Sequence, residues 1–277
     1  MVAEVVGFLE GRRAVVDMTL GTGGHSRALL EAGVGRVVGI DRDADAVAHA
    51  SERLHGFGER FRAIRMRFAE VGEDAVGRAD GVLYDLGVSS MQVDRAERGF
   101  SFRHDGPLDM RMGREDDGPT ASDLVNGLPE RELADLIFRF GDEPRSRRIA
   151  GAIVRRRPIR TTDELAGVIV GAVGRRPGGP HPARRTFQAL RIAVNREIEE
   201  LAASLPQAVG LLVPGGRVVV ISYHSLEDGL VKRTFREDPR LQMLTKKPLR
   251  PHPDEVARNP RARSARLRAA DRVEEAA

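Results

Sequence analysis

The sequence predicts an α/β protein in which a doubly wound parallel sheet is interrupted by an all-helical insertion. Short apolar strands alternate with helix-length stretches over residues 1–103, helix signals alone fill residues 107–205, and an apolar strand returns at Gly216–His224. Alternating strands and helices are typical of parallel sheets with right-handed crossovers. We therefore expect residues 1–106 and 206–277 to form one discontinuous domain, with residues 107–205 inserted as a helical domain.

The strands expected in the first part of the chain share an apolar, β-branched character. They are Val15–Asp17, Val37–Asp41, Phe61–Phe68 and Gly81–Asp85, and Ala44–Leu54 between them has helical spacing. Ligands on such a sheet bind at the carboxyl ends of its strands. The turn after Val15–Asp17 and the residues Asp41, Phe68 and Asp85 should therefore lie at one edge.

A glycine-rich turn, Gly21–Gly24, follows the first strand and leads into a helix. Glycine permits backbone angles and close approaches that a side chain would block, so a ligand can lie against bare backbone at the helix N-terminus. Asp41 comes twenty residues after Gly21, where an acidic side chain can accept hydrogen bonds from two ribose hydroxyls. Ser26 stands where a dinucleotide fingerprint has its third glycine, which favours S-adenosylmethionine over a nicotinamide cofactor. The alternative is an ordinary turn between strand and helix.

The inserted region is expected to consist of five helices, and a glycine- and proline-rich loop at Gly174–Pro182 should separate the last two. The helices are one starting at Thr120–Asp123, then Glu130–Phe140, Arg145–Arg157, Asp163–Val173 capped by Thr161 or Thr162, and Thr186–Leu205. After the returning strand we expect a helix at Leu226–Arg236 and the last strand or hairpin at Leu241–Leu249. Residues 251–277 contain few apolar side chains, so part of them should order only on a partner.

Composition excludes several classes of protein. The 277 residues contain no run of 18 apolar residues, and no charged-then-apolar leader precedes the first strand, so we expect a soluble, unexported, cytoplasmic protein that does not bind a membrane. Cysteine is absent, which excludes disulfides, thiolate zinc sites, iron–sulfur clusters and cysteine nucleophiles. We expect no metal site.

The net charge of +4 conceals two strongly basic segments. The segment from Pro144 to Arg196 contains thirteen arginines and only two acidic residues. The segment from Leu230 to Ala270 contains twelve basic and four acidic residues. Basic segments on an acidic body suggest a polyanion such as a nucleic acid, although an arginine and alanine bias can also reflect base composition. The candidate RNA-phosphate contacts are Arg145, Arg148, Arg155, Arg184, Arg185 and Arg191. Several arginines share one predicted helix and cannot all face one side, so some are only solvated.

Six motifs occur in order along the chain. They are Thr19–Ser26, Asp85–Ser90, Arg98–Phe102, Asp105–Met112, Arg185–Asn195 and Ser222–Asp228. Together they resemble the bacterial ribosomal RNA small subunit methyltransferase H family, also called RsmH or MraW, from about Val15 to Arg268. The chain departs from the family pattern at Met91, where proline is common.

The resemblance implies a Rossmann-like class I S-adenosylmethionine-dependent methyltransferase with an inserted all-helical domain that recognises RNA. It also implies methylation of the exocyclic N4 of one cytidine in the decoding region of 16S rRNA, in the small ribosomal subunit. Carried over by motif, the cofactor contacts fall on Gly23, Gly24, His25, Asp41, Phe68, Asp85 and Gln92. We expect His25 to contribute backbone rather than ring chemistry, because it lies at a helix start where amide groups are free.

Three residues are candidates for the chemical step. Asp85 follows the fourth strand, where many amino-group methyltransferases place an Asp/Asn-Pro-Pro-aromatic turn, so we expect it to orient the amino group; the alternative is that it caps the strand end. Asp109 and His224 are second candidates. Each has a plain alternative, since Asp109 can pair with Arg111 or Arg114 and His224 can cap the helix that follows it.

The chemistry of cytosine limits which atom of the base this chain could methylate. Methylation at C5 uses a cysteine that adds to the ring, and this chain has none, so a cytosine substrate would be methylated on nitrogen. The cytidine should be single-stranded or flipped, because N4 is engaged when the base is paired. Two other functions stay open. One is that of a non-catalytic RNA-binding ribosome assembly factor that retains a nucleotide-binding fold, and the other is that of a nicotinamide-dependent oxidoreductase. The oligomeric state, monomer or homodimer, is also open.

Overall fold

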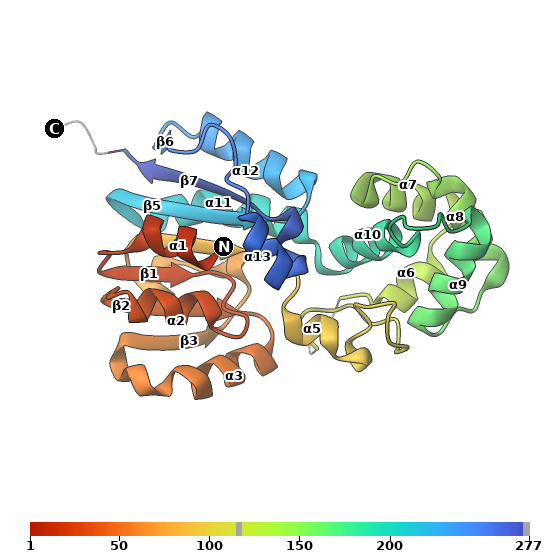
Figure 1. The fold of residues 1–277 in the computed structure, drawn as a ribbon, viewed down its shortest axis with the longest axis horizontal. Helices are drawn as coiled ribbons and strands as arrows, with labels where there is room; N and C mark the ends of the chain where they lie inside the picture. Colours follow the sequence, from red (N-terminus) through yellow and green to blue (C-terminus); the bar gives the residue numbers. More distant parts are fainter. Residues whose placement is uncertain (115–117, 274–277) are drawn as a thin grey trace. The chain divides into compact units, whose positions relative to one another are not determined.

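The computed structural model describes residues 1–114 and 118–273, which form two compact units (Figure 1). Met1–Gly87 and the chain from Ile198 onward form the first, called here the sheet unit, and Val88–Glu197 form the second, called here the helical unit. No helix in these described residues combines the length and the apolar character that a membrane crossing requires.

The sheet unit is built on seven strands in the order β3-β2-β1-β4-β5-β7-β6. Their bounds are β1 Ala14–Asp17, β2 Arg36–Asp41, β3 Phe61–Arg65, β4 Ala79–Asp85, β5 Leu212–Ser222, β6 Leu241–Met243 and β7 Arg266–Arg272. The first five strands in this order are parallel, and β7 runs antiparallel to both β5 and β6. The order 3-2-1-4-5 is that of a Rossmann-type sheet, so the predicted fold class is confirmed.

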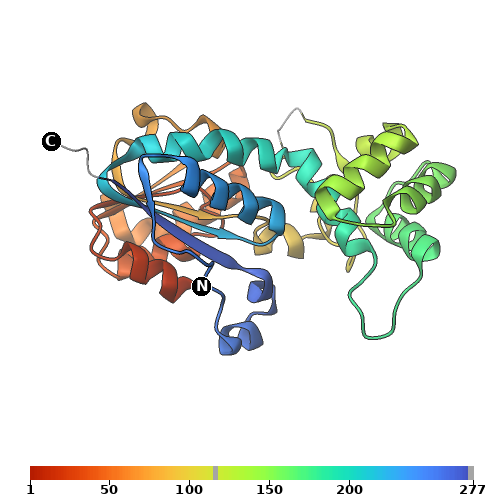
Figure 2. The same cartoon turned by 90° about the horizontal axis from the view of Figure 1, so that it is seen from above.

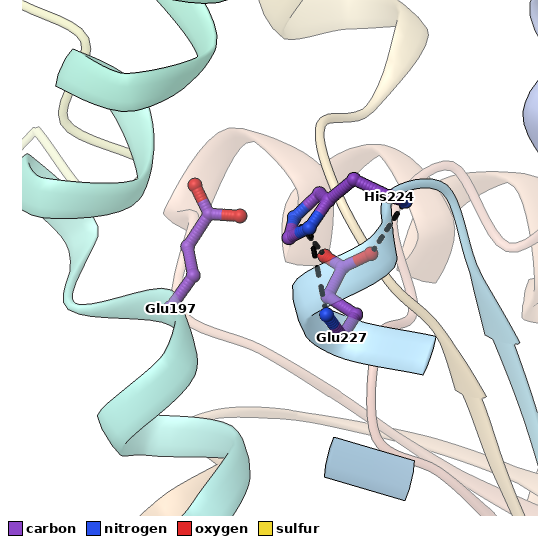
Figure 3. Close-up of side chains that lie close together, drawn as sticks. All are labelled: Glu197, His224 and Glu227. Carbon is purple, nitrogen blue, oxygen red and sulfur yellow. Dashed lines mark hydrogen bonds and ion pairs between the residues drawn. The ribbon is translucent and has the colours of Figure 1, made fainter. Parts of the chain in front are cut away.

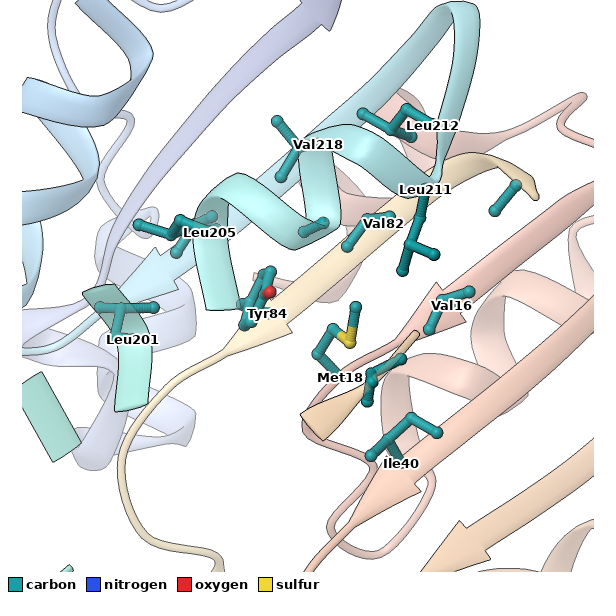
Figure 4. Close-up of a cluster of buried hydrophobic side chains, with 14 of the residues drawn as sticks. Val16, Met18, Ile40, Val82, Tyr84, Leu201, Leu205, Leu211, Leu212 and Val218 are labelled. Atoms are coloured by element: carbon teal, nitrogen blue, oxygen red, sulfur yellow. The ribbon is translucent and has the colours of Figure 1, made fainter. Parts of the chain in front are cut away.

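Helices cover both faces of this sheet (Figure 2). The helices of the sheet unit are α1 Val2–Leu9, α2 Gly24–Glu31, α3 Ala44–Leu54, α4 Glu73–Val76, α11 Glu197–Leu211, α12 Ser225–Glu237 and α13 Pro253–Arg258. Side chains alternate along a strand, so Val15 packs with α1 and α2 on one face while its neighbour Val16 packs with α11 and α12 on the other. On the face that α11 and α12 cover, Tyr84 lies among buried apolar side chains (Figure 4), and its hydroxyl shares a hydrogen bond of 2.5 Å with Ser204 of α11.

The helical unit contains six α-helices in its described residues. They are α5 Ser90–Asp94, α6 Ala121–Gly127, α7 Glu130–Gly141, α8 Ser146–Arg156, α9 Thr162–Val173 and α10 Ala183–Asn195. Of these, α6 to α10 contribute side chains to one apolar core. Leu133, Ile149, Leu165 and Leu190 are fully buried in this core. Of the two threonines predicted to cap α9, Thr161 does so, because its hydroxyl accepts the backbone N–H of Glu164 in a capping box.

The limits of the insertion differ from the predicted 107–205. The helical unit begins at Val88, because Phe100 and Phe102 already pack against its core. It ends at Glu197, because Leu201 and Leu205 pack in the core of the sheet unit. The prediction followed where helix signals begin and end, whereas the two units are divided by where the side chains pack.

The predicted single helix Thr186–Leu205 is wrong. Arg196 takes a left-handed conformation with φ of 50°, which ends α10 at Asn195, and α11 then continues through Pro206 to Leu211. A non-glycine residue rarely adopts this conformation, so the sequence carries no signal for the break.

We expected part of residues 251–277 to order only on a partner, and for residues 251–273 this expectation is wrong. β7 pairs with β5 on one side and β6 on the other. The small side chains of Ala269 and Ala270 are buried there, and the buried Arg268 donates to Asp228 from Nε at 2.7 Å. Residues 274–277 lie outside the described part of the chain.

Candidate active site

The turn after β1 places the N-terminus of α2 at the carboxyl edge of the sheet. Gly21 and Gly23 have positive φ values of 50° and 75°, and α2 begins at Gly24. The positive φ of Gly23 favours glycine there, and a Cβ on it would also lie 2.9 Å from Leu54 Cδ1 of α3, which would have to shift. Gly24 has open space where a side chain would lie, which leaves its backbone open to a ligand.

Asp41, at the end of β2, holds this turn by its side chain. Its Oδ2 accepts the backbone N–H of Gly21 at 2.8 Å, and its Oδ1 accepts that of Asp43 at 2.9 Å. Burial raises the pKa of Asp41 to about 6, although both hydrogen bonds act to lower it. Each carboxylate oxygen has a further lone pair, so the ionised group can still accept hydrogen bonds from a vicinal diol such as that of a ribose.

Ser26 has a role that the sequence did not reveal. It is fully buried and donates its hydroxyl to Oδ2 of the buried Asp17 at 2.7 Å, while Oδ1 of Asp17 accepts the backbone N–H of Thr19 at 3.2 Å. Burial raises the pKa of Asp17 above its usual value. The serine that breaks the dinucleotide fingerprint therefore joins the first turn of α2 to the end of β1.

Asp85 ends β4 and lies at the centre of a polar cluster. Its Oδ1 accepts the hydroxyl of Tyr223 at 2.9 Å, and its Oδ2 lies 3.2 Å from Nε2 of His25. The backbone N–H of Asp85 donates to Thr19 Oγ1 at 2.6 Å. The carboxyl side chain remains 28% exposed, so it can also receive a donor from a ligand. Asp85 and His25, which were predicted from separate motifs as cofactor contacts, thus lie together in the structure.

Sequence reasoning missed Tyr223 as a member of this cluster. Tyr223 follows β5 directly, and β5 pairs with β4 in a register that puts Ile221 opposite Asp85. The tyrosine lies within the Ser222–Asp228 motif, and that motif was the available signal. Only the adjacency of β4 and β5 shows that the tyrosine reaches Asp85.

The cluster has a defined protonation pattern. Burial alone would lower the pKa of His25, but the hydrogen bond and charge of Asp85 more than offset this and raise it. Burial, and then the negative charge of Asp85, raise the pKa of Tyr223, which therefore stays a neutral donor. The other ring nitrogen of His25, Nδ1, is buried and has no hydrogen-bond partner within residues 1–114 and 118–273. It is a polar atom that a ligand can satisfy.

Phe68 and Gln92, both nominated as cofactor contacts, have structural contacts of their own. The ring of Phe68 packs edge-on against Tyr84 at 5.8 Å between centroids, at the border of the core. Gln92 belongs to the helical unit, where it is buried and forms a capping box with Ser89. The packing of Phe68, which lies three residues after the end of β3, matches a role in the core, whereas the contacts of Gln92 belong to the start of α5.

Asp109 and His224 both have the structural contacts that their plain alternatives predicted, and their part in the chemistry stays a prediction. Both carboxylate oxygens of Asp109 accept hydrogen bonds from Arg111, at 2.7 and 3.0 Å. Burial alone would raise the pKa of Asp109, but Arg111 outweighs burial and lowers it. His224 caps α12 through Nδ1, which accepts the N–H of Glu227 at 3.5 Å, and its Nε2 lies 3.0 Å from Glu227 Oε1 without hydrogen-bond alignment (Figure 3).

The candidate RNA contacts divide into two groups. Arg191 differs from the others, because its guanidinium makes two hydrogen bonds to Glu197, at 2.7 and 2.8 Å, and both side chains are largely buried. The remaining candidates are all exposed; they are Arg145, Arg148, Arg155, Arg184 and Arg185. Arg145 and Arg185 flank the buried carboxylate of Glu143 at 3.5 and 3.9 Å.

A Rossmann-type sheet with acidic side chains at the ends of β1, β2 and β4, around a glycine turn and a helix N-terminus, is typical of domains that bind a nucleotide-like cofactor. The chain belongs to the MraW methylase family, whose model matches residues 1–273. It is therefore a methyltransferase, and the resemblance seen in its six motifs is confirmed.

Curated relatives are similar over nearly the whole chain. A protein of Methylobacterium sp. (strain 4-46) named "Ribosomal RNA small subunit methyltransferase H" is 51% identical, covering 99% of this chain and 90% of its own. A protein of the same name from Gloeobacter violaceus is 53% identical, covering 93% and 82%. A solved rRNA methylase from Streptococcus thermophilus aligns with a TM-score of 0.47 and 12% identity over 99% of this chain and 94% of that one, too distant a likeness to add to the assignment.

Proposed function

We propose that this protein transfers a methyl group from S-adenosylmethionine to the exocyclic N4 of one cytidine in the decoding region of 16S rRNA, in the small ribosomal subunit. The observation that carries the proposal is family membership, with relatives above 50% identity that are named as methyltransferases of small-subunit rRNA. The absence of cysteine supports nitrogen over C5 as the methylated atom.

The residues at the carboxyl edge of the sheet fit this cofactor. Asp41 would accept the two ribose hydroxyls through its free lone pairs, and the backbone at Gly24 is open to close approach. Nδ1 of His25 needs a polar partner, and the amino acid end of the cofactor offers both a carboxylate and an amino group. Asp85 adds a negative charge that favours a sulfonium cation nearby. When bound, the cofactor supplies an electrophilic methyl group.

Asp85 is the residue that we assign to the reacting amino group. The N4 lone pair of cytosine is delocalised into the ring, so the enzyme must orient the nitrogen and accept a hydrogen bond as its positive charge develops. Asp85 is exposed enough to accept that bond, while Tyr223 and His25 fix the direction of its two oxygens. Transfer of the methyl group to N4 would leave the cofactor as a neutral thioether, and the proton that N4 loses would pass to water.

The exposed arginines of the helical unit are proposed to bind RNA phosphates. Arg145, Arg148 and Arg155 all belong to α8 or to the residue before it. Contacts between such side chains and phosphates make binding strongly dependent on salt.

Transfer of tritium from methyl-labelled S-adenosylmethionine tests the reaction. Small ribosomal subunits that lack the modification should accept label up to one methyl group per subunit, and subunits that already carry it should accept none. Equal labelling of both preparations would contradict the proposed site. Cofactor binding without transfer to either would favour an assembly factor.

A further inference from the structure

The helical unit contains an aromatic stack whose function the methyl-transfer site does not explain. The rings of Phe102 and His181 lie parallel, with 4.4 Å between centroids and 18° between planes, and Phe187 supports Phe102 edge-on at 5.2 Å. Phe187 is buried, whereas Phe102 and His181 each keep part of their surface in solvent. The stack therefore runs from the core of the helical unit to its surface and ends in the ring of His181.

The ring of His181 is held in place and is uncharged. Its Nδ1 accepts the backbone N–H of Ala183 at 3.2 Å in the first turn of α10, so the ring proton lies on Nε2. Burial, and then the positive charge of Arg175, lower the pKa of His181, so the imidazole is neutral at physiological pH. A flat, neutral ring fixed on an aromatic neighbour offers a face on which another flat ring can stack.

The charge around this stack favours an anionic partner. The segments that carry its two rings also carry five exposed arginines: Arg103, Arg175, Arg176, Arg184 and Arg185. Aromatic rings beside arginines are the combination by which proteins hold single-stranded nucleic acids, since bases stack on the rings and phosphates bind the cations.

We propose that Phe102 and His181 form a stacking platform for one unpaired base of the rRNA substrate, with the base on the face of His181 opposite Phe102 and its phosphates near the flanking arginines. This inference rests on the proposed function. It assigns to the helical unit a binding site for a single nucleotide, in addition to the phosphate contacts of α8.

Two substitutions at His181 separate stacking from helix capping. His181→Phe keeps an aromatic ring but loses the acceptor for the Ala183 N–H, whereas His181→Asn keeps a capping acceptor and loses the ring. Affinity is measured by fluorescence anisotropy with a labelled single-stranded RNA that spans the decoding region. We expect His181→Asn to weaken binding by about tenfold or more. His181→Phe should bind within about twofold of wild type. The reverse order, or equal affinity of both variants with wild type, would overturn the platform.

An abasic scan locates the stacked base. Replacing each nucleotide of the RNA in turn by an abasic one should weaken wild-type binding most at one position, and that penalty should vanish in His181→Asn. A penalty that stays the same in the variant contradicts stacking on this ring. Thermal unfolding of both variants controls for the fold. If the wild-type protein methylates subunits but the variants show no difference, the platform fails alone; if the wild type neither binds nor methylates RNA, the proposed function fails.

Discussion

S-adenosylhomocysteine is the cofactor after loss of its methyl group. Lowering the pH through about 6 should weaken its binding, because the lower pH protonates Asp41. Burial raises the pKa of this carboxyl from 3.8 to about 6. The proposed ribose contacts need the ionised form, since a protonated carboxyl loses acceptor capacity and gains an O–H. The other hydrogen bonds of Asp41, to the N–H groups of Gly21 and Asp43, also favour the carboxylate.

The size of the effect follows from one proton. With a pKa of about 6 the carboxyl is almost fully ionised at pH 7.5 and about one-tenth ionised at pH 5, so affinity should fall about tenfold between these values. The free protein should show the opposite trend in stability. The folded state holds this proton more tightly than the unfolded state, so the ionisation of Asp41 lowers the unfolding free energy as pH rises from about 4 to about 6. Two pKa units correspond to about 3 kcal/mol, which partial exposure of the group reduces to about 1–2 kcal/mol.

Isothermal titration of the wild type and of Asp41→Asn between pH 5 and 7.5 is the assay. The variant should bind S-adenosylhomocysteine weakly at every pH, without the tenfold change in affinity. It also serves as a control for His25, because the raised pKa of this histidine affects both proteins alike. A wild-type affinity that is equal at pH 5 and 7.5 refutes the assignment of Asp41. A variant that loses affinity as steeply as the wild type refutes it too.

Three further substitutions test the other assignments. Tyr223→Phe removes the hydroxyl that donates to Asp85, so kcat should fall about tenfold while the affinity for S-adenosylhomocysteine changes less than twofold; equal losses in both would indicate a merely structural role. Arg191→Ala leaves the buried Glu197 unpaired, so thermal or urea unfolding should show a loss of about 3 kcal/mol with RNA affinity of the folded protein unchanged. Arg148→Gln should do the reverse, with stability unchanged and the slope of log affinity against log salt smaller by about 1. If Arg148→Gln leaves that slope unaltered, this residue does not contact phosphate.

The parts of the fold that local sequence determines were predictable. The strands β1, β2 and β4 each combine an apolar run with a terminal aspartate, and the spacing from Gly21 to Asp41 indicated the cofactor edge before any pairing was known. The position of β7 was not predictable from apolar content. Its buried Arg268 looks like a surface residue until its pairing with Asp228 is seen.

The site itself was predictable only where its geometry is local. The contact between Asp85 and Tyr223 joins residues 138 positions apart and depends on β4 lying beside β5. Asp109 and His224 were nominated for chemistry because acidic and imidazole groups near a sheet edge can be catalytic. The structure pairs them with Arg111 and Glu227, which lie within three positions in the sequence, while their part in the chemistry stays a prediction.

Mass spectrometry of nucleosides shows directly which atom of which base this protein methylates. Small ribosomal subunits lacking the modification are incubated with the purified protein and S-adenosylmethionine that carries a deuterated methyl group, and their 16S rRNA is digested and analysed. We expect one new deuterated N4-methylcytidine per subunit with the wild-type protein, and none with Asp85→Ala. A methyl group at C5 or on another base, or full activity of Asp85→Ala, would contradict this expectation.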